Sequence, residues 1–303
     1  MSTYDPVALE CLAAIVEEGG FERAAQRLNV TQSAVSQRLR ALEAQVGSVL
    51  IVRSRPLRAT PAGRLLLKHT QQQRLLRADL ERDLQELTPH TPDGTREDER
   101  ISIAINADSI ATWAMGALHD LVRQHLPLEI IVDDQDFTQE WLRSGQVLGC
   151  VTTLEQALRG CKMLPLGAMH YVAVASTDYA QQYLPQGLTP HNFREVSFLS
   201  FNRKDDMAAE FVARAFGLHR VALKHLFVPG SEAQMRAVAA GWAVGVVPEL
   251  LARDPIANGS MVDLAPGRSL PIQLYWHCWN LESELLDTLS RALMRAATRS
   301  LST

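Results

Sequence analysis

The sequence has few cysteines and no long hydrophobic run, and both absences limit what this protein can be. The four cysteines are scattered, without a C-x-x-C pair or histidines at metal-ligand spacing, which excludes the common zinc motifs and favours buried free thiols. No eighteen apolar residues run together, and residues 1–10 lack a basic segment followed by an apolar one. We therefore expect a cytoplasmic protein with no membrane association and no metal site.

Catalytic motifs are also absent. The chain has no G-x-S-x-G elbow, no H-E-x-x-H helix, no Walker loop and no G-x-G-x-x-G after a strand. His119 and His125 do not have the i, i+4 spacing of a metal-binding pair on a helix. These absences predict a protein that is not an enzyme and that needs no cofactor.

Positive charge does not dominate the chain, but it is concentrated near one end. The net charge is -4, yet residues 23–68 hold nine Lys and Arg residues and one acidic residue, Glu43. The remainder is therefore clearly acidic. This asymmetry is expected of a DNA-binding head on a body that does not bind DNA, because neutralising phosphates requires clustered positive charge.

The spacing of apolar residues divides the chain into parts. At 303 residues, 47% of them hydrophobic, the chain can form two or three packed cores. Residues 5–87 have the three- and four-residue spacing of helices, whereas residues 88–99, with two prolines, a glycine and no large apolar residue, predict a hinge. From residue 100 strands and helices alternate, which predicts an α/β domain with a largely parallel sheet.

Eight strands and a closing helix are expected in this second part. The helix covers residues 282–299, and the strands cover residues 101–105, 128–132, 147–151, 171–175, 197–201, 225–228, 244–247 and 273–277.

A helix-turn-helix is expected near the N-terminus. The first helix starts at Phe21, and its small Ala24 and Ala25 let a second helix approach closely. Asn29 can adopt the left-handed conformation of the turn, and Thr31 is a good N-cap for the helix that follows. The pattern is typical of a DNA-reading unit.

The second helix has one apolar and one polar face. At about 100° per residue, a buried stripe is formed by Val35, Leu39, Leu42 and Val46. The opposite face carries groups suited to base edges in a major groove, where Gln pairs with adenine and Arg with guanine: Ser33, Ser36, Gln37 and Arg40. A polar outer face is also what any surface helix has, so this face alone leaves both interpretations open.

A basic hairpin is expected next to this helix. Residues 49–60 predict a short hairpin with Arg53, Arg55 and Arg58 at or near its tip. Such a wing can bind phosphates or enter the minor groove, and a solvated basic loop is the alternative.

A long helix is expected to begin at Thr60-Pro61, by the cap-then-proline pattern. About 26 residues at 1.5 Å each give roughly 40 Å, too long to be stable alone. We expect it to pair with a second copy, although packing on its own C-terminal domain is an alternative. One stripe carries Leu65, His69, Gln72, Leu76, Leu80, Leu84 and Leu87.

The N-terminal motifs resemble a known family. The run from Ala24 to Glu43, with Gly47, Arg53 and the Thr60–Gly63 segment, is similar to the head of LysR-type transcriptional regulators. The resemblance implies a winged helix-turn-helix (1–62), a dimerising linker helix (61–87), a hinge (88–99) and an effector domain (100–303) built like periplasmic binding proteins. Subdomain I would cover about 100–168 and 269–303, and subdomain II about 169–268.

This resemblance also implies partners and DNA contacts. The partners are a double-stranded DNA operator, RNA polymerase and further copies of the chain, as a homodimer and a homotetramer built as a dimer of dimers, with DNA bending that depends on an effector. The expected location is the nucleoid within the cytoplasm. The predicted DNA-binding residues are Thr31, Gln32, Ser33, Ser36, Gln37, Arg38, Arg40, Arg53, Arg55 and Arg58.

Segments along almost the whole chain resemble the lysine- and arginine-responsive ArgP and LysG branch of this family. They are residues 21–25, 106–113, 205–207, 231–233 and 275–277. The branch implies activation of a basic amino-acid exporter gene, with lysine and arginine having different effects. One member of the branch was also described as an inhibitor of chromosome initiation, so an architectural DNA-binding protein is the alternative.

The effector site is expected at strand ends and helix starts, where open α/β sheets place ligands. The helix start at Asn106–Ser109 favours an anion such as an α-carboxylate, and carboxylates would neutralise a cationic amino acid. Asp133 is a further acid of this kind, and capping or surface roles are the alternatives. Phe137 and Trp141 stand where relatives often carry Arg. The predicted effector-binding residues are Asp108, Ser109, Thr112, Asp134, Thr152, Thr153, Asp206, Ser231 and Glu232.

Overall fold

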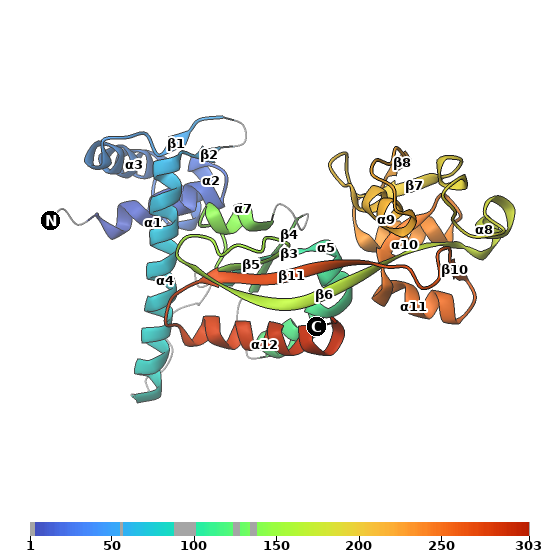
Figure 1. Cartoon of the computed structure of the whole chain (residues 1–303). Helices are drawn as coiled ribbons and strands as arrows, with labels where there is room; N and C mark the ends of the chain where they lie inside the picture. Colours follow the sequence, from blue (N-terminus) through green and yellow to red (C-terminus); the bar gives the residue numbers. More distant parts are fainter. Residues whose placement is uncertain (1–3, 55–56, 88–100, 124–127, 134–137, 303) are drawn as a thin grey trace.

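The chain has an N-terminal helical head, a single long helix and a larger α/β domain with two lobes (Figure 1). The computed structural model describes residues 4–54, 57–87, 101–123, 128–133 and 138–302. The predicted hinge at residues 88–99 lies outside the described residues, as do Arg55, Asp134 and Phe137.

Three helices and a two-stranded hairpin form the head. They are α1 (Pro6–Glu17), α2 (Phe21–Arg27), α3 (Gln32–Val46), β1 (Ile51–Val52) and β2 (Arg58–Ala59). Thr31 caps α3 by accepting a hydrogen bond from the Ala34 amide at 3.2 Å. Asn29 adopts the left-handed conformation, with φ of 51°. Ala24, Ala25 and the inner face of α3 are buried, so the predicted winged helix-turn-helix is confirmed.

The hairpin is fixed to the start of the long helix α4 (Pro61–Leu87). The Thr60 hydroxyl donates to the Val49 carbonyl at 2.8 Å and accepts from the Gly63 amide at 3.1 Å. A Cβ atom at Gly63 would lie 2.2 Å from the Leu50 carbonyl oxygen. Position 63 therefore requires glycine, and the wing and α4 move together.

Helix α4 has three distinct sides. Leu66 and Leu67 pack into the head core, and Leu75 packs into the core of the α/β domain. The leucine stripe faces outward: Leu65 is 72% exposed, and Leu76, Leu80 and Leu84 are 45–56% exposed. Packing on the chain's own C-terminal domain therefore occurs on one side, while the stripe proposed for pairing has no cover within the described chain.

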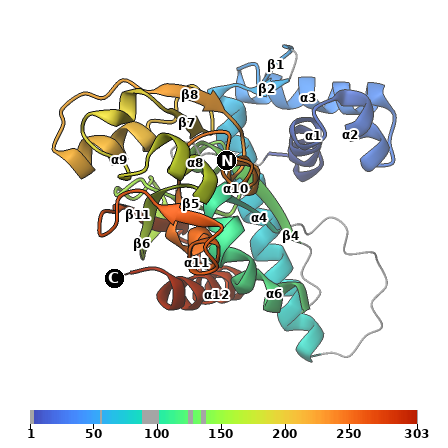
Figure 2. The ribbon, with the colours of Figure 1, turned by 90° about the vertical axis from the view of Figure 1, so that its right-hand side faces the viewer.

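The first lobe holds most of the sheet and the helices around it. Its elements are β3 (Ile101–Asn106), α5 (Ala107–Ser109), the π-helix η2 (Ile110–Ala114), α6 (Met115–Arg123), β4 (Leu128–Asp133), α7 (Thr138–Arg143), β5 (Gly149–Thr152) and α12 (Glu284–Ser300). Figure 2 shows α6 and α12 near one another.

The second lobe is smaller. Its elements are α8 (Thr177–Tyr183), the 3-10 turn η3 (Asn192–Arg194), β7 (Ser197–Ser200), α9 (Met207–Phe216), β8 (Lys224–Phe227), α10 (Ser231–Ala239), β9 (Gly245–Pro248), α11 (Glu249–Ala257) and β10 (Met261–Asp263). β7 and β8 form a separate parallel pair.

Two long strands, β6 (Cys161–Ser176) and β11 (Leu270–Trp279), connect the lobes (Figure 1). The large sheet has the order β10-β6-β11-β5-β3-β4, with β9 also on β6. Among the described strands of this sheet, only the β3–β4 and β3–β5 pairs are parallel, and all pairings of β11 and β6 are antiparallel. The expectation of a largely parallel sheet was therefore wrong, because β11 runs antiparallel to β6 along the whole of β11 and the rest of β6 pairs antiparallel with β9 and β10.

Candidate functional site

The predicted reading face of α3 is open to solvent. Thr31, Gln32, Ser33, Gln37 and Arg40 are exposed, and Ser36 is half-buried. On the other side of α3, Val35, Leu39 and Leu42 are buried against α1 and α2, whereas Val46 is only partly buried. The helix therefore offers short polar, amide and guanidinium groups on a rigid support, as base readout in a major groove requires.

The wing lies next to this face. Arg53 and Arg58 are exposed, and the Arg53 guanidinium stacks over the Phe21 ring at 5.3 Å. Glu43, the single acid of this basic region, accepts a hydrogen bond from the Leu50 amide at 2.9 Å. Its carboxylate thus fixes the wing relative to α3.

Arg38 is placed differently from the other predicted DNA-binding residues. It is half-buried beside Cys11 of α1. Burial raises the pKa of the Cys11 thiol, and Arg38 acts in the opposite direction. Arg38 therefore contacts the head interior as well as the α3 surface.

A small acidic pocket of about 60 Å³ lies between the two lobes of the α/β domain. Three of its described lining residues are carboxylates, Asp108, Asp133 and Asp205, and none is a lysine, arginine or histidine. Both lobes contribute, through the ends of β3, β4 and β7 and the starts of α9 and α10. Such a site favours a cationic ligand, because a buried positive charge needs carboxylate partners.

Asp108 joins the lobes at this pocket. Its Oδ2 accepts a hydrogen bond from the Tyr171 hydroxyl at 2.6 Å, and its Oδ1 accepts one from the Ser231 hydroxyl at 2.5 Å. Tyr171 lies on β6 and Ser231 begins α10. The carboxylate therefore bridges three elements from distant parts of the chain.

Asn106 contributes an acceptor to the same pocket. Its side chain is 2% exposed, and its Oδ1 has no hydrogen-bond partner among the described residues. A buried carbonyl oxygen without a donor costs about 1–3 kcal/mol. Asn106 belongs to the helix-start motif predicted from the sequence but was not among the predicted binding residues; its place at the end of β3 was the available signal.

The other predicted acids lie in different surroundings. Asp206 is exposed and outside the pocket lining, whereas Asp205 lines it and accepts from the Phe201 and Met207 amides at 2.6 and 2.9 Å. The Glu232 side chain is 75% exposed and pairs with Arg236. The prediction from the sequence missed Asp205, although its position two residues before the helix start at Met207 is typical of a capping carboxylate.

The predicted hydroxyl groups are buried or internally bonded. Ser109 is fully buried and accepts from the Trp113 indole at 3.2 Å. The Thr112 hydroxyl donates to the Asp108 carbonyl at 2.6 Å. Thr152 is buried and bonds Gln139 at 3.0 Å, and Thr153 is half-buried. Of the predicted effector residues, the structure brings Asp108 and Ser231 together in the pocket.

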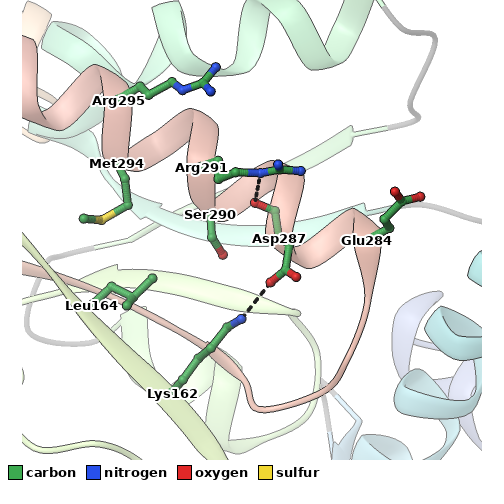
Figure 3. Close-up of a pocket in the computed structure, with 8 residues that line it drawn as sticks. All are labelled: Lys162, Leu164, Glu284, Asp287, Ser290, Arg291, Met294 and Arg295. Atoms are coloured by element: carbon green, nitrogen blue, oxygen red, sulfur yellow. Dashed lines mark hydrogen bonds and ion pairs between the residues drawn. The ribbon is translucent and has the colours of Figure 1, made fainter.

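A larger pocket of about 440 Å³ lies elsewhere, between the start of β6 and α12 (Figure 3). Lys162 pairs there with Asp287 at 2.9 Å, and Arg291 donates to the Asp287 carbonyl. Acids and bases are mixed and Leu164 and Met294 form its apolar part. This pocket selects neither sign of charge, whereas the acidic pocket between the lobes favours a cation.

Two further properties concern the described part of the chain. No helix in it combines the length and the apolar composition needed to cross a bilayer. The described side chains also contain no group of three or more potential metal ligands.

Comparison with known proteins accounts for the whole architecture. Residues 7–64 match the helix-turn-helix model of bacterial regulatory proteins of the lysR family, and residues 94–301 match the LysR substrate binding domain. The chain is 40% identical to the transcriptional regulator ArgP of Aeromonas salmonicida over 99% of both chains. It is also 40% identical to LysG of Mycobacterium tuberculosis, over 97% of this chain and 93% of LysG.

Two solved structures share the fold along the full chain. The crystal structure of ArgP from Mycobacterium tuberculosis has a TM-score of 0.83 and 38% identity, covering 99% of both chains. Full-length LysG from Corynebacterium glutamicum with bound effector arginine has a TM-score of 0.72 and 30% identity, covering 99% of this chain and all of LysG. With a winged helix-turn-helix, a two-lobed α/β domain and relatives that are regulators rather than enzymes, the chain belongs to the LysR family of transcriptional regulators.

Proposed function

We propose that a basic amino acid, arginine or lysine, controls DNA binding by this regulator and binds in the acidic pocket between the lobes. The observation that carries this proposal is the chemistry of the described lining: three carboxylates, an unpaired Asn106 oxygen and no basic side chain. The similar LysG from Corynebacterium glutamicum has arginine bound as an effector. The side-chain cation would interact with the carboxylates and Asn106, and the α-carboxylate with free amides at a helix start.

The volume of the pocket implies that binding rearranges it. About 60 Å³ holds only a few water molecules, which is less than a basic amino acid needs. We infer that binding widens the pocket by moving the Tyr171 or Ser231 hydroxyl away from Asp108 and the lobes slightly apart. β6 and β11, which run through both lobes, are the connections about which such a movement would occur.

We further propose that the regulator acts as a dimer or a dimer of dimers, with α4 as the pairing helix, and that it activates a basic amino-acid exporter gene. The exposed leucines of α4 support pairing with a second copy. Two heads then contact two half-sites of one operator through α3 and the wing. RNA polymerase would be the partner recruited at the promoter.

Isothermal titration with arginine, lysine, citrulline and leucine tests the effector assignment. Citrulline has the shape of arginine without its charge, so it separates charge recognition from fit. We expect arginine or lysine to bind and citrulline and leucine not to bind. Asp108→Asn should weaken arginine binding about tenfold or more, since a charge-assisted hydrogen bond is lost. Equal binding of citrulline and arginine would contradict the proposal.

A further inference from the structure

Helix α4 is held between the head and the effector domain over residues 68–75. On one side Arg74 donates to Glu10 and, at 2.8 Å, to Glu17 of α1. On the other side Leu75 is 4% exposed in the effector-domain core, and the Lys68 ammonium donates to the Arg159 carbonyl at 3.2 Å. Any shift of the effector domain at this segment therefore reaches the DNA-binding head.

Gly145 makes the closest contact in this segment. It is buried, has φ of 75°, and follows α7, which lies beside α4 in Figure 1. A Cβ atom at this position would lie 2.6, 2.7 and 2.9 Å from the N, Cα and Cβ atoms of Lys68. The contact is between two backbones, so no side-chain rotation can relieve a change in it, and one helix must move with the other.

A short chain of hydrogen bonds connects Gly145 to the acidic pocket. The pocket residue Asp133 accepts from the Trp141 indole of α7 at 2.8 Å. The Trp141 carbonyl accepts from the Gln146 amide at 3.0 Å, and the Leu142 carbonyl accepts from the Gly145 amide at 3.2 Å. The turn that touches α4 is thus built on the same helix end that binds a pocket carboxylate.

We propose that Trp141 and Gly145 transmit effector binding from the pocket to the head within one chain. A cation beside Asp133 attracts its carboxylate more strongly than the neutral indole does, because charge-assisted hydrogen bonds are stronger. The change in the Asp133–Trp141 bond shifts α7, and Gly145 passes the shift to α4 at Lys68. This inference rests on the proposed function, since it requires a cationic effector in that pocket.

The test measures how far the effector changes DNA affinity. The probe is a DNA duplex selected in vitro by the wild-type protein from a random pool, and its Kd is measured with and without saturating arginine or lysine. We expect a ratio of about fivefold or more for the wild type. For Gly145→Ala and Trp141→Phe we expect the effector to change the DNA Kd by less than about twofold. Calorimetry should show that both variants still bind arginine.

Gly217→Ala is the matched control. Gly217 also has a positive φ, of 66°, but a Cβ atom there would have no neighbour within 4 Å. The control therefore has the same backbone strain without the contact, and should keep the wild-type ratio. Trp141→Phe keeps an aromatic ring, although a smaller one, and removes the indole donor, so it covers the case in which Gly145→Ala does not fold.

The outcomes separate this inference from the proposed function. If the wild type binds neither arginine nor lysine, the proposed function fails and the inference fails with it. If the wild type binds and responds but both variants respond equally, the inference alone is overturned. Loss of arginine binding in both variants would also overturn it, because the two residues would then serve the pocket itself.

Discussion

Asn106 presents a buried acceptor with no donor among the described residues, and this predicts an unusual pair of effects. Asn106→Leu removes the unsatisfied oxygen, so the thermal midpoint without ligand should stay the same or rise. Arginine affinity should fall about tenfold, since the ligand loses one charge-assisted hydrogen bond. Differential scanning fluorimetry and calorimetry on the same preparation measure both quantities.

Asn192 provides the contrasting control. Its side chain is fully used, accepting from the Thr189 amide at 2.8 Å and donating to the Gly187 carbonyl at 2.9 Å. Asn192→Leu should therefore lower the thermal midpoint and leave arginine affinity unchanged. An Asn106→Leu protein that is destabilised and binds arginine normally would show that this oxygen has another role.

Single residues of the pocket could be predicted only in part. Asp108 was predicted because its segment follows a strand and opens a helix, and Ser231 because it lies in a segment that resembles the ArgP and LysG branch. Asp205 was missed in favour of Asp206, because adjacent acids at a helix start look equivalent in a sequence. Only Asp205 accepts hydrogen bonds from the Phe201 and Met207 amides. Which of the two acids does so depends on the path of the folded backbone, which the sequence does not show.

At the level of elements, the contact between α1 and α4 depends on a cluster of charges. Burial alone would raise the pKa of Glu17, but Arg74 and Arg27 lower it below its usual value. The folded state therefore binds a proton less readily than the unfolded state. The charge cluster therefore stabilises the protein at pH values above the pKa that Glu17 has in the unfolded chain. This contribution is lost as the pH falls through the lower pKa that Glu17 has in the folded protein.

Glu17→Gln tests this contribution. Glu17 accepts from Arg27, Arg74 and Gln71, so the variant should lose about 1.5–3 kcal/mol of unfolding free energy at neutral pH. The loss should shrink as the pH falls below the glutamate range. Urea unfolding of both proteins at several pH values measures it, and a loss that does not vary with pH would contradict the assignment.

The leucine stripe of α4 predicts the oligomeric state. Leu80 and Leu84 are about half-exposed in the single chain, so burying the exposed half of each against a second copy contributes about 0.8–1.5 kcal/mol, half of the value for a fully buried leucine. Leu80→Lys with Leu84→Lys should shift the protein towards monomer in light scattering and weaken operator binding.

Elements defined by local signals were predicted well. The Thr31 cap, the Asn29 turn and the Thr60-Pro61 start are read from neighbouring residues, and all three are present. β6 was predicted as residues 171–175 but covers sixteen residues. Its first half, from Cys161 to Gly167, is mostly half-buried without a clear alternation, because pairing with β11 rather than its own sequence makes it a strand.

For the whole molecule, DNA binding must come from the head although the net charge is -4. Each Lys or Arg that neutralises a phosphate releases counterions, so the slope of log K against log salt counts these contacts, at about 0.9 per phosphate. Exposed Arg53 on the wing should contribute one such contact. Arg53→Ala should therefore lower the slope by about one, with a uniform loss of affinity across DNA sequences.

Arg253 of the effector domain is the control that separates local from overall charge. It is exposed and paired with Glu249, far from the head in the chain. Arg253→Ala changes the net charge of the molecule by the same amount as Arg53→Ala, so it should leave the slope unchanged if binding depends on the head. Fluorescence anisotropy between 50 and 200 mM salt, roughly the range over which such contacts dominate, gives both slopes. Equal changes in the two variants would mean that the overall charge governs association, and Arg53 would then have no direct phosphate contact.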